Sequence, residues 1–497
     1  MESLSDTTWD VVICGTGLPQ SLLALALSRS DKKILHVDPN EYYGSSDAAF
    51  SLQEAEEWAA SRGRAGDSVF SAASVTKADG QDALRSRAYS LSLTPHLIHT
   101  RSKLLSQLVS SRAFRQVEFL AVGSFFIYKP ASGSDAKPSL ARIPSTREAV
   151  FMSTTIPARA KRALMKFLKF VLEYDSEPQT ETWKPHADTP LVDFLESQFK
   201  LDDELRTYVL TLTLSLDGRA STRDGLAMIQ RHLTSMGMFG PGFAAVYPKW
   251  GGDGEIAQVA CRAGAVGGAV YMLGTGIQQL KPSDGDEELE IELTNDVTIK
   301  SRLLVRSSEA PADPIQRVSR LTAVIDAHIP SLFEVVTEGA PTPAVAVIAF
   351  PAASVRSGDG VASELPVYVA VHSSDTGECP AGQSVLYLTT PCSTTSKSVL
   401  EQCLKSFLSA VDAQTAPTVV YQLYYEQSGG PANSSLNGRV FELPNSSLDL
   451  SFNDAILEPV HQAWKQVMGG EVSEEVDEEY MKFKDREGMG DDDNDYD

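Results

Sequence analysis

Residues 11–20 read Val11-Val12-Ile13-Cys14-Gly15-Thr16-Gly17-Leu18-Pro19-Gln20, and this stretch decides the fold. An apolar strand leads into Gly15 and Gly17, and a second apolar run, Ile34 to Val37, ends at Asp38. This pattern is typical of a strand–helix–strand unit that binds a dinucleotide. Its glycines let the backbone approach a pyrophosphate at a helix N-terminus, and its acid holds a ribose. The stretch therefore predicts an α/β fold of the FAD/NAD(P)-binding type.

One part of this fingerprint is missing. The third glycine, which would let helix and strand pack closely, is replaced by Gln20, and Pro19 precedes it. The pattern keeps its fold signal, but the cofactor signal is weakened. From the motif alone, cofactor binding and an inherited scaffold without a cofactor remain equally open, because a fold does not fix a function.

Length and composition indicate a globular protein with room for two or three domains, since the chain has 497 residues and is 42% hydrophobic. No run of 18 apolar residues occurs, so we expect no transmembrane helix. The first residues lack the features of a signal peptide. The five cysteines, an odd number without Cys-x-x-Cys spacing, are interpreted as reduced thiols. Together these features predict a soluble, cytoplasmic protein.

The charge is strongly negative, with a formal net charge of −23. Residues 471–497 hold 13 acidic against 3 basic side chains and are predicted to be a solvated, disordered tail, with binding to a basic partner as the alternative. The acidity argues against nucleic acid or anionic lipid as the main ligand, because phosphate binding needs clustered lysines and arginines.

The pattern along the chain divides it into four segments. Residues 1–140 and 244–470 are predicted to form the two parts of one large α/β domain, and residues 471–497 the tail. Residues 141–243 carry apolar side chains at helical spacing and are predicted to form an inserted all-helical domain. Strands are expected in the second part at 289–293, 297–305, 344–350, 366–372, 385–390 and 418–425, and helices at 398–411 and 454–468. The polar stretch 61–81 is predicted to be a surface loop.

Catalytic chemistry finds little support in the sequence. The eight histidines show no triad or metal-ligand spacing, and no Gly-x-x-x-x-Gly-Lys-Ser/Thr phosphate loop occurs. His96 and His99 lie three residues apart, but no third ligand is spaced near them. We therefore predict no metal site and no catalytic residue. A flavin- or nicotinamide-dependent oxidoreductase remains an alternative that rests on the incomplete fingerprint.

Two blocks of sequence resemble a known family, the Rab GDP-dissociation inhibitor and Rab escort protein superfamily. The first block comprises Gly15-Thr16-Gly17-Leu18, His36-x-Asp38 and Tyr42-Tyr43-Gly44. The second comprises Tyr247-Pro248-Lys249-Trp250-Gly251, Gly254-Glu255-Ile256-Ala257-Gln258, Arg262 and Tyr271-Met272-Leu273. One extra residue between Trp250 and Glu255, and Ile-Ala in place of Leu-Pro, depart from the family pattern. The resemblance covers most of residues 8–275 and is patchier to about residue 470.

Three features favour the escort branch: Pro19-Gln20-Ser21, Ala48 to Leu52, and the helix Leu164 to Tyr174 with Val150-Phe151 ahead of it. The resemblance implies an oxidoreductase-like fold that binds partners without catalysis and without a cofactor. The implied partners are GDP-bound Rab GTPases, unprenylated and prenylated, the α/β heterodimer of Rab geranylgeranyltransferase, and the geranylgeranyl lipid. Delivery to membranes implies transient membrane association. A Rab GDP-dissociation inhibitor is the alternative.

Site residues follow from the same resemblance. It implies a Rab-binding platform of Tyr43, Glu255, Arg262 and Met272, and it leaves Gly15, Gly17 and Asp38 as a vestigial dinucleotide motif. Candidates for the groove that binds the Rab C-terminal tail are Leu104, Leu105, Leu108, Val109 and Phe119, although simple core packing explains them equally well. Phe151 is the implied anchor for the transferase, with Arg159 where an apolar companion is expected. The helical domain is the candidate lipid site.

Overall fold

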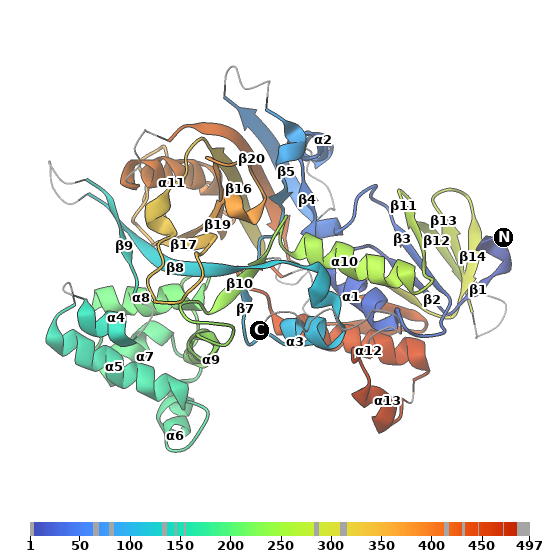
Figure 1. Ribbon diagram of the computed structural model, residues 1–497, viewed down its shortest axis with the longest axis horizontal. Coiled ribbons are helices and arrows are strands. Elements are labelled where there is room, and N and C mark those ends of the chain that lie inside the picture. The colour runs from blue at the N-terminus through green and yellow to red at the C-terminus, as the bar shows by residue number, and fades with distance from the viewer. Residues whose placement is uncertain are drawn as a thin grey trace, which may run out of the picture.

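The computed structural model describes residues 4–62, 69–78, 84–131, 137–144, 147–153, 156–282, 288–308, 316–411, 417–429, 433–445, 447–470 and 472–484. Within these ranges the strands form sheets of ten, six, four and two strands. We call the region around the six-stranded sheet the first lobe, and the region around the ten-stranded sheet the second lobe. Helices from the middle of the chain form a helical domain beside the second lobe (Figure 1).

The first lobe is built on a mostly parallel sheet in the order β11-β3-β2-β15-β22-β21. Its strands are β2 (Val11–Cys14), β3 (Ile34–Asp38), β11 (Val270–Leu273), β15 (Leu304–Ser307), β21 (Ser435–Asn437) and β22 (Val440–Leu443). Alternate residues of β2 face opposite sides, as a strand requires, so both faces of this sheet must be covered. Val11 and Ile13 pack against helices, whereas Val12 packs against a second, smaller sheet.

The helices on the first face are α1 (Leu18–Leu27), α10 (Asp253–Val266) and α12 (Leu457–Met468). The smaller sheet on the other face contains β1 (Thr8–Trp9), β12 (Ile277–Pro282), β13 (Leu289–Leu293) and β14 (Thr298–Ser301). This three-layer arrangement places the N-terminus of α1 at the carboxyl ends of β2 and β3, where a dinucleotide would lie in an enzyme of this fold.

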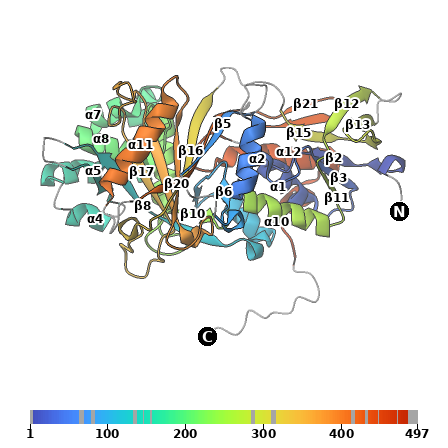
Figure 2. The ribbon, with the colours of Figure 1, turned by 90° about the horizontal axis from the view of Figure 1, so that it is seen from above.

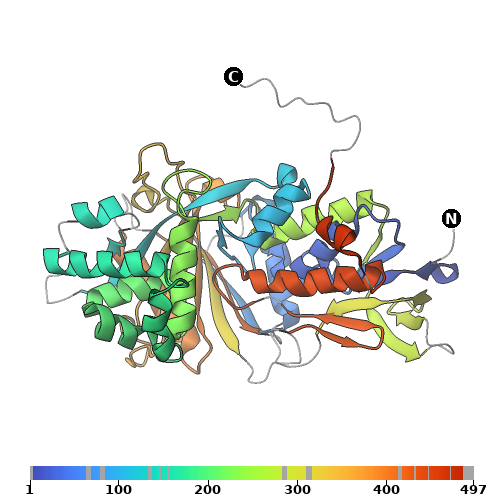
Figure 3. The same ribbon diagram turned by 90° about the horizontal axis from the view of Figure 1, so that it is seen from below.

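The second lobe is a mixed sheet in the order β5-β20-β16-β19-β18-β17-β8-β10-β7, with β9 beside β8. Its strands are β5 (Phe70–Lys77), β7 (Ile98–His99), β8 (Phe119–Lys129), β9 (Ser139–Arg142), β10 (Ala245–Pro248), β16 (Arg317–Ile325), β17 (Val345–Phe350), β18 (Val367–Ser373), β19 (Ser384–Pro391) and β20 (Val419–Ser428). Helix α11 (Ser396–Ala410) covers one face, as seen from above in Figure 2. The helical domain covers the other face, as seen from below in Figure 3. Helix α2 (Leu52–Arg62) and the short strands β4 (Ala49–Phe50) and β6 (Leu91–Ser92) pack near β5.

The helical domain lies within the predicted insertion 141–243. Its helices are α4 (Arg147–Met152), α5 (Ala158–Leu172), α6 (Gln179–Trp183), α7 (Leu191–Phe199), α8 (Asp203–Thr213) and α9 (Thr222–Ser235). The predicted apolar stripe of α5 is buried through Leu164, Phe167 and Val171. Phe167 contacts Phe199 of α7 edge to face at 5.2 Å, so the stripe forms the core between the helices and the sheet.

The C-terminal segment corrects one prediction. Residues 472–484 are structured: α13 (Glu474–Glu478) lies beside α12 (Figure 3), and Met481 is 1% exposed in the core of the first lobe. The prediction of disorder from residue 471 is therefore wrong for these residues. Met481 is buried in the first-lobe core, with Tyr480 and Phe483 packed against it, so this segment is held in place despite its acidic neighbours. Residues 485–497 lie outside the described residues.

Three strand predictions also differ from the structure. The predicted loop 61–81 contains β5, an edge strand of the large sheet. The predicted strand 297–305 is two strands, because β14 and β15 belong to different sheets. Strand β16 was not predicted, although it lies in the centre of the large sheet. In the described part of the chain, no helix is long and apolar enough to cross a bilayer.

Candidate functional site

The turn after β2 has the backbone of a dinucleotide-binding loop. Gly15 adopts φ +96°, which a side chain would strain, and Gly17 precedes α1. The acid of the motif is fully buried and bonded within the protein. Asp38 Oδ2 accepts hydrogen bonds from the Thr16 amide at 2.7 Å and from the Thr16 hydroxyl at 2.6 Å, and Asp38 Oδ1 accepts one from the Asn40 amide at 2.8 Å. Asp38 therefore locks the loop instead of presenting a carboxylate to a ribose.

Protein side chains fill the place of the pyrophosphate. The Leu18 amide at the start of α1 donates to Asp47 Oδ2 at 2.9 Å, and Asp47 is 1% exposed. Gln20 Nε2 donates to Ser307 Oγ at 2.7 Å. A Cβ on Gly17 would meet Gln20 Oε1 at 3.2 Å. A helix N-terminus binds anions, but here a buried carboxylate already occupies it, so the residues present do not fit a dinucleotide.

The segment after Asp38 presents Tyr43 at the surface. Gly44 adopts φ +96°, and its amide donates to Thr16 Oγ1 at 3.0 Å, which ties this turn to the vestigial loop. The ring of Tyr42 packs edge-on against Phe50 at 4.8 Å and anchors the segment. Tyr43 stays half-buried, with its ring 6.3 Å from that of Tyr271 on β11.

Helix α10 carries the charged part of the predicted platform. Glu255 is half-buried, while Gln258 and Arg262 are exposed. These side chains recur every three to four residues, so they share one face. Glu255 and Arg262 are about 10 Å apart along the axis, so they do not pair with each other. Burial raises the pKa of Glu255. Gln258 was not predicted as a site residue, although its spacing was a sufficient signal.

Strand β11 directs Tyr271 toward α10 and Met272 to the opposite face of the sheet, where Met272 packs with Val37 against the smaller sheet. The strand pairs in parallel with β3, with Met272 opposite Val37 and Tyr271 opposite His36, at the edge of the sheet. Met272 is half-buried. A Cβ on Gly264 of α10 would lie 2.5 Å from the Tyr271 hydroxyl, so the helix can approach β11 only because this residue is glycine. The structure thus brings Tyr43 of the first sequence block close to Tyr271 and α10 of the second, whereas Met272 lies on the other face of the sheet.

The loop before α10 holds the extra residue of this chain. Trp250 adopts φ +71°, followed by Gly251 at +123° and Gly252 at +69°. The Trp250 amide donates to Thr376 O at 2.8 Å, and its ring lies over Gly377, where a Cβ would overlap it. Trp250 is still 52% exposed. This aromatic side chain was not predicted as a site residue, and it extends the surface beyond the N-terminus of α10.

A buried ion pair holds the N-terminus of α10. His96 Nδ1 lies 2.7 Å from Asp253 Oδ2, and both side chains are almost fully buried. Burial alone would lower the pKa of His96, but the adjacent carboxylate of Asp253 raises it above its ordinary value. Across the ranges that the structure describes, no group of three or more His, Cys, Asp or Glu could hold a metal ion. The histidine is therefore placed as a structural group.

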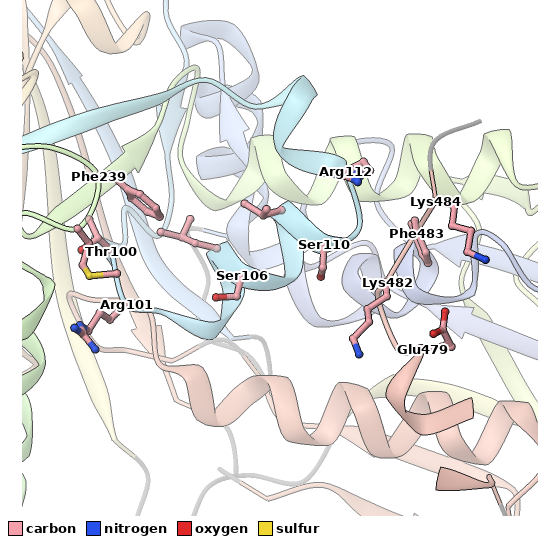
Figure 4. Close-up of a pocket in the computed structure, with 13 residues that line it drawn as sticks. Thr100, Arg101, Ser106, Ser110, Arg112, Phe239, Glu479, Lys482, Phe483 and Lys484 are labelled. Carbon is pink, nitrogen blue, oxygen red and sulfur yellow. The ribbon is translucent and has the colours of Figure 1, made fainter. Parts of the chain in front are cut away.

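The residues predicted for the tail groove differ in where they lie. Helix α3 (Lys103–Ser110) buries Leu104 and Leu108 in the first-lobe core, at 0% and 1% exposure, so these two were wrongly assigned to a binding surface. Leu105 and Val109 do line a groove of about 790 Å³ (Figure 4). Phe119 is half-buried against the core and does not line it. Helical periodicity marks one apolar stripe, but it does not reveal which part of the stripe other segments cover.

The predicted transferase-binding residues lie at the surface of the helical domain. Phe151 on α4 is 59% exposed, and its neighbour Met152, which was not predicted, is 81% exposed. Arg159, in the first turn of α5, is also exposed. The two helices are tied together where Lys161 Nζ donates to Phe151 O at 2.7 Å. Two adjacent large apolar side chains that are this exposed are typical of a surface that contacts another molecule.

Comparisons with known proteins give relatives that are named component A of Rab geranylgeranyltransferase or Rab escort protein. A Saccharomyces cerevisiae protein named Rab proteins geranylgeranyltransferase component A is 31% identical over 390 residues, which cover 77% of this chain and 61% of that protein. Rab escort protein 1 of Arabidopsis thaliana is 24% identical, with 94% of each chain covered. The chain spans about three fifths of the two yeast relatives it matches first, from S. cerevisiae and Candida albicans, at 61% and 59% of their lengths.

Solved structures agree on the fold. A Rab GDI from Plasmodium falciparum superposes with a TM-score of 0.64 at 19% identity and covers 94% of this chain and 99% of its own. An oxidoreductase from Methanosarcina mazei superposes with a TM-score of 0.58 at 12% identity over 92% of this chain and 99% of its own. These likenesses confirm the predicted oxidoreductase-like fold. The sequence profile of the family described as GDI, GDP dissociation inhibitor, matches residues 5–472. The chain therefore belongs to the GDP dissociation inhibitor family.

Proposed function

We propose that the chain is a Rab escort protein. It binds newly made, GDP-bound Rab GTPases, presents them to the α/β heterodimer of Rab geranylgeranyltransferase, and carries the prenylated product to membranes. One observation carries this proposal: the loop that would bind a dinucleotide in an enzyme of this fold is filled by protein side chains, and its continuation presents a protein-binding side chain instead. The dinucleotide site is filled by Gln20 and Asp47, while the same loop presents Tyr43 beside α10 and β11. The relatives named component A and Rab escort protein support the escort branch.

The surface of Tyr43, Glu255, Arg262 and Met272 has the chemistry of a protein-binding platform. Its aromatic and thioether groups offer adaptable apolar contact, and Arg262 offers a planar guanidinium that pairs with a carboxylate in a fixed orientation. Because Tyr43 is half-buried beside Tyr271 and Met272 is half-buried on strand β11, little side-chain entropy is lost when a partner binds. The Rab tail then lies along Leu105 and Val109.

The helical domain is the proposed lipid site. Each CH₂ group of an exposed prenyl chain costs roughly 0.8 kcal/mol in water, so a carrier must cover the lipid during transfer between membranes. Phe151 fits the role of transferase anchor, because a large apolar side chain that fills a pocket of its partner is typical of a binding hot spot. Arg159 stands nearby, so the contact in this chain combines an apolar anchor with a charge. A carrier of this kind works in the cytoplasm and associates with membranes only transiently.

A prenylation assay tests the proposal. Purified transferase, a Rab GTPase and labelled geranylgeranyl diphosphate are mixed with and without this chain. We expect transfer only when the chain is present, and strongly reduced transfer with Phe151→Ala. Val361→Ala, which shortens an equally exposed apolar side chain elsewhere, should behave like the parent. Equal transfer with and without the chain would rule out the escort role.

A Rab GDP-dissociation inhibitor is the second candidate, supported by the likeness to the P. falciparum Rab GDI and by the same platform. It predicts extraction of prenylated Rab from membranes with no binding to the transferase, so a pull-down of the heterodimer separates the two candidates. A flavin-dependent oxidoreductase is opposed by the filled dinucleotide site. It would require a yellow protein that releases a dinucleotide on denaturation.

A further inference from the structure

The groove along α3 has a wall made by the C-terminal segment of the same chain. Leu105, Val109 and Met238 supply apolar lining, and Phe239 stands at one end of the groove (Figure 4). At the other end lie residues of the stretch 479–484, which we call the C-terminal wall. The wall is thus part of the lining of a groove for which the sequence predicted only residues of α3 and Phe119 of β8.

The C-terminal wall is fixed to the first lobe. The Phe483 amide donates to Ser110 O at 3.0 Å, and Ser110 is the last residue of α3. A carbonyl at a helix C-terminus has no partner within the helix, so the wall satisfies it and holds the end of α3 in place. Arg29 donates to Lys484 O at 2.7 Å, and its guanidinium lies 5.0 Å from the Phe483 ring centroid. Met481 fills the core between these contacts.

A second set of contacts fixes the approach to the wall. Asp477 of α13 accepts from Lys465 at 2.8 Å and lies 2.6 Å from His461, both on α12. The Tyr480 ring stacks on His461 with centroids 4.2 Å apart. The wall is therefore held by contacts both before and after residue 480, so it can keep the side chains that line the groove in fixed positions.

The rim of the groove is positively charged. Arg101, Arg112, Lys482 and Lys484 line it and are exposed, whereas Glu479 is the one acid in the described lining. Most of the chain has the opposite character, since its net charge is −23. An apolar floor with a cationic rim fits an extended segment in which apolar residues alternate with or adjoin acidic ones.

We propose that the C-terminal wall makes the α3 groove a binding site for extended, apolar segments flanked by acidic residues. Met481 and Phe483 place the wall, and Lys482 and Lys484 select the charge of the bound segment. The inference rests on the proposed function in that the segment would be the tail of a Rab GTPase. It adds a selectivity for acidic tails, and it makes the end of the chain part of the site.

Two labelled synthetic peptides test the charge selectivity by fluorescence anisotropy. They share one Leu- and Ser-containing core, flanked by Glu in one peptide and by Lys in the other. The full chain should prefer the Glu-flanked peptide. Lys482→Glu/Lys484→Glu should weaken its binding by about tenfold at low ionic strength, and salt should reduce the difference. Lys300→Glu/Lys405→Glu changes the net charge equally at distant exposed positions and should bind like the parent. Equal binding of both peptides by the full chain overturns the proposal.

Two truncated chains test the wall itself. A chain that ends at Glu487 keeps the wall and should bind the Glu-flanked peptide like the parent, whereas one that ends at Gly470 should lose at least tenfold in affinity. Undiminished binding by the shorter chain overturns the proposal. A gain of more than tenfold for the chain ending at Glu487 would also overturn it, because the occupant would then be the chain's own acidic end.

Phe483→Pro tests the contact to α3 in case the shorter chain does not fold. It removes the amide that donates to Ser110 O, and Phe483→Ala, which keeps that amide, is its control. We expect weaker peptide binding with proline than with alanine, and equal weakening would contradict the role of the wall. A Rab GTPase without its C-terminal tail separates this inference from the proposed function. It should bind the parent and the Lys482→Glu/Lys484→Glu variant equally well, and its failure to bind the parent would contradict the proposed function alone.

Discussion

The carboxylate of Asp47 stands where a pyrophosphate would lie, so its removal should loosen α1. Asp47→Ala leaves the buried Leu18 amide without its charged acceptor and removes one of two acceptors of the Thr94 hydroxyl, which lies 3.1 Å from Asp47 Oδ1 and 3.2 Å from Ser46 O. A charge-assisted hydrogen bond contributes roughly 1.5–3 kcal/mol, and a carboxylate at a helix N-terminus up to about 1 kcal/mol more. We therefore expect the opening free energy of α1 to fall by about 3 kcal/mol, which is about a 150-fold change in its opening equilibrium constant.

Hydrogen exchange of a peptide that covers Leu18–Leu27 measures this change directly, since local opening of one segment does not require unfolding of the whole chain. Asp47→Asn keeps an oxygen acceptor without the charge and should accelerate exchange by about tenfold or less. Exchange in α11, in the second lobe, should be unchanged and serves as the internal control. If Asp47→Ala changes α1 exchange by less than about threefold, Asp47 does not support the helix and our account of the filled dinucleotide site is wrong.

Four further predictions concern separate parts of the molecule. Gly377→Ala should displace the Trp250 ring, seen as greater quenching of tryptophan fluorescence by acrylamide, and should destabilise the loop by about 1–2 kcal/mol from its φ of +75° alone. Burial lowers the pKa of His36 to about 4, so the folded state binds fewer protons than the unfolded state between pH 6.5 and 4. Its contribution is present above pH 6.5 and is lost as the pH falls, so urea unfolding should show about 2 kcal/mol less stability at pH 5 than at pH 7, less so in His36→Gln. Phe167→Ala should destabilise the helical domain by about 3–5 kcal/mol, measured as faster proteolysis there with unchanged α1 exchange. Arg262→Ala should change unfolding free energy by less than about 0.5 kcal/mol but lower Rab affinity about tenfold by titration calorimetry.

Local sequence patterns predicted those elements that depend only on residues close together in the chain. Gly15, Gly17 and Asp38 fix a strand–helix–strand unit through backbone conformation, and the apolar stripe of α5 follows from helical periodicity. Strand β16 was not predicted, because Arg320 interrupts the run of apolar residues in its sequence. This arginine is 3% exposed and donates from Nε to Gln427 Oε1 at 2.8 Å, a partner 107 residues away that no local pattern reveals.

The candidate site was predictable where residue type alone carries the chemistry, as in the two sequence blocks of the platform. The site was not predictable where a segment distant in the chain covers a side chain or leaves it exposed to solvent. Leu108 and Val109 are neighbours on the same short helix, yet Leu108 is buried in the core, whereas Val109 is 47% exposed and lines the groove. The C-terminal wall was missed because acidic composition outweighed its three apolar side chains, although their spacing, Tyr480-Met481 and Phe483, was a usable signal of packing.

The order of strands in the first lobe also constrains how the chain folds during synthesis. Strand β2 is made near the start, but its neighbour β15 and the next strand, β22, come from Leu304–Ser307 and Val440–Leu443. A ribosome needs on the order of tens of seconds to reach β15. Throughout that time one edge of β2 offers unpaired backbone groups and the apolar side chains of Val11, Val12 and Ile13. The first lobe thus closes only after Val440–Leu443 has been made, and a nascent chain needs protection at that edge of β2 until then.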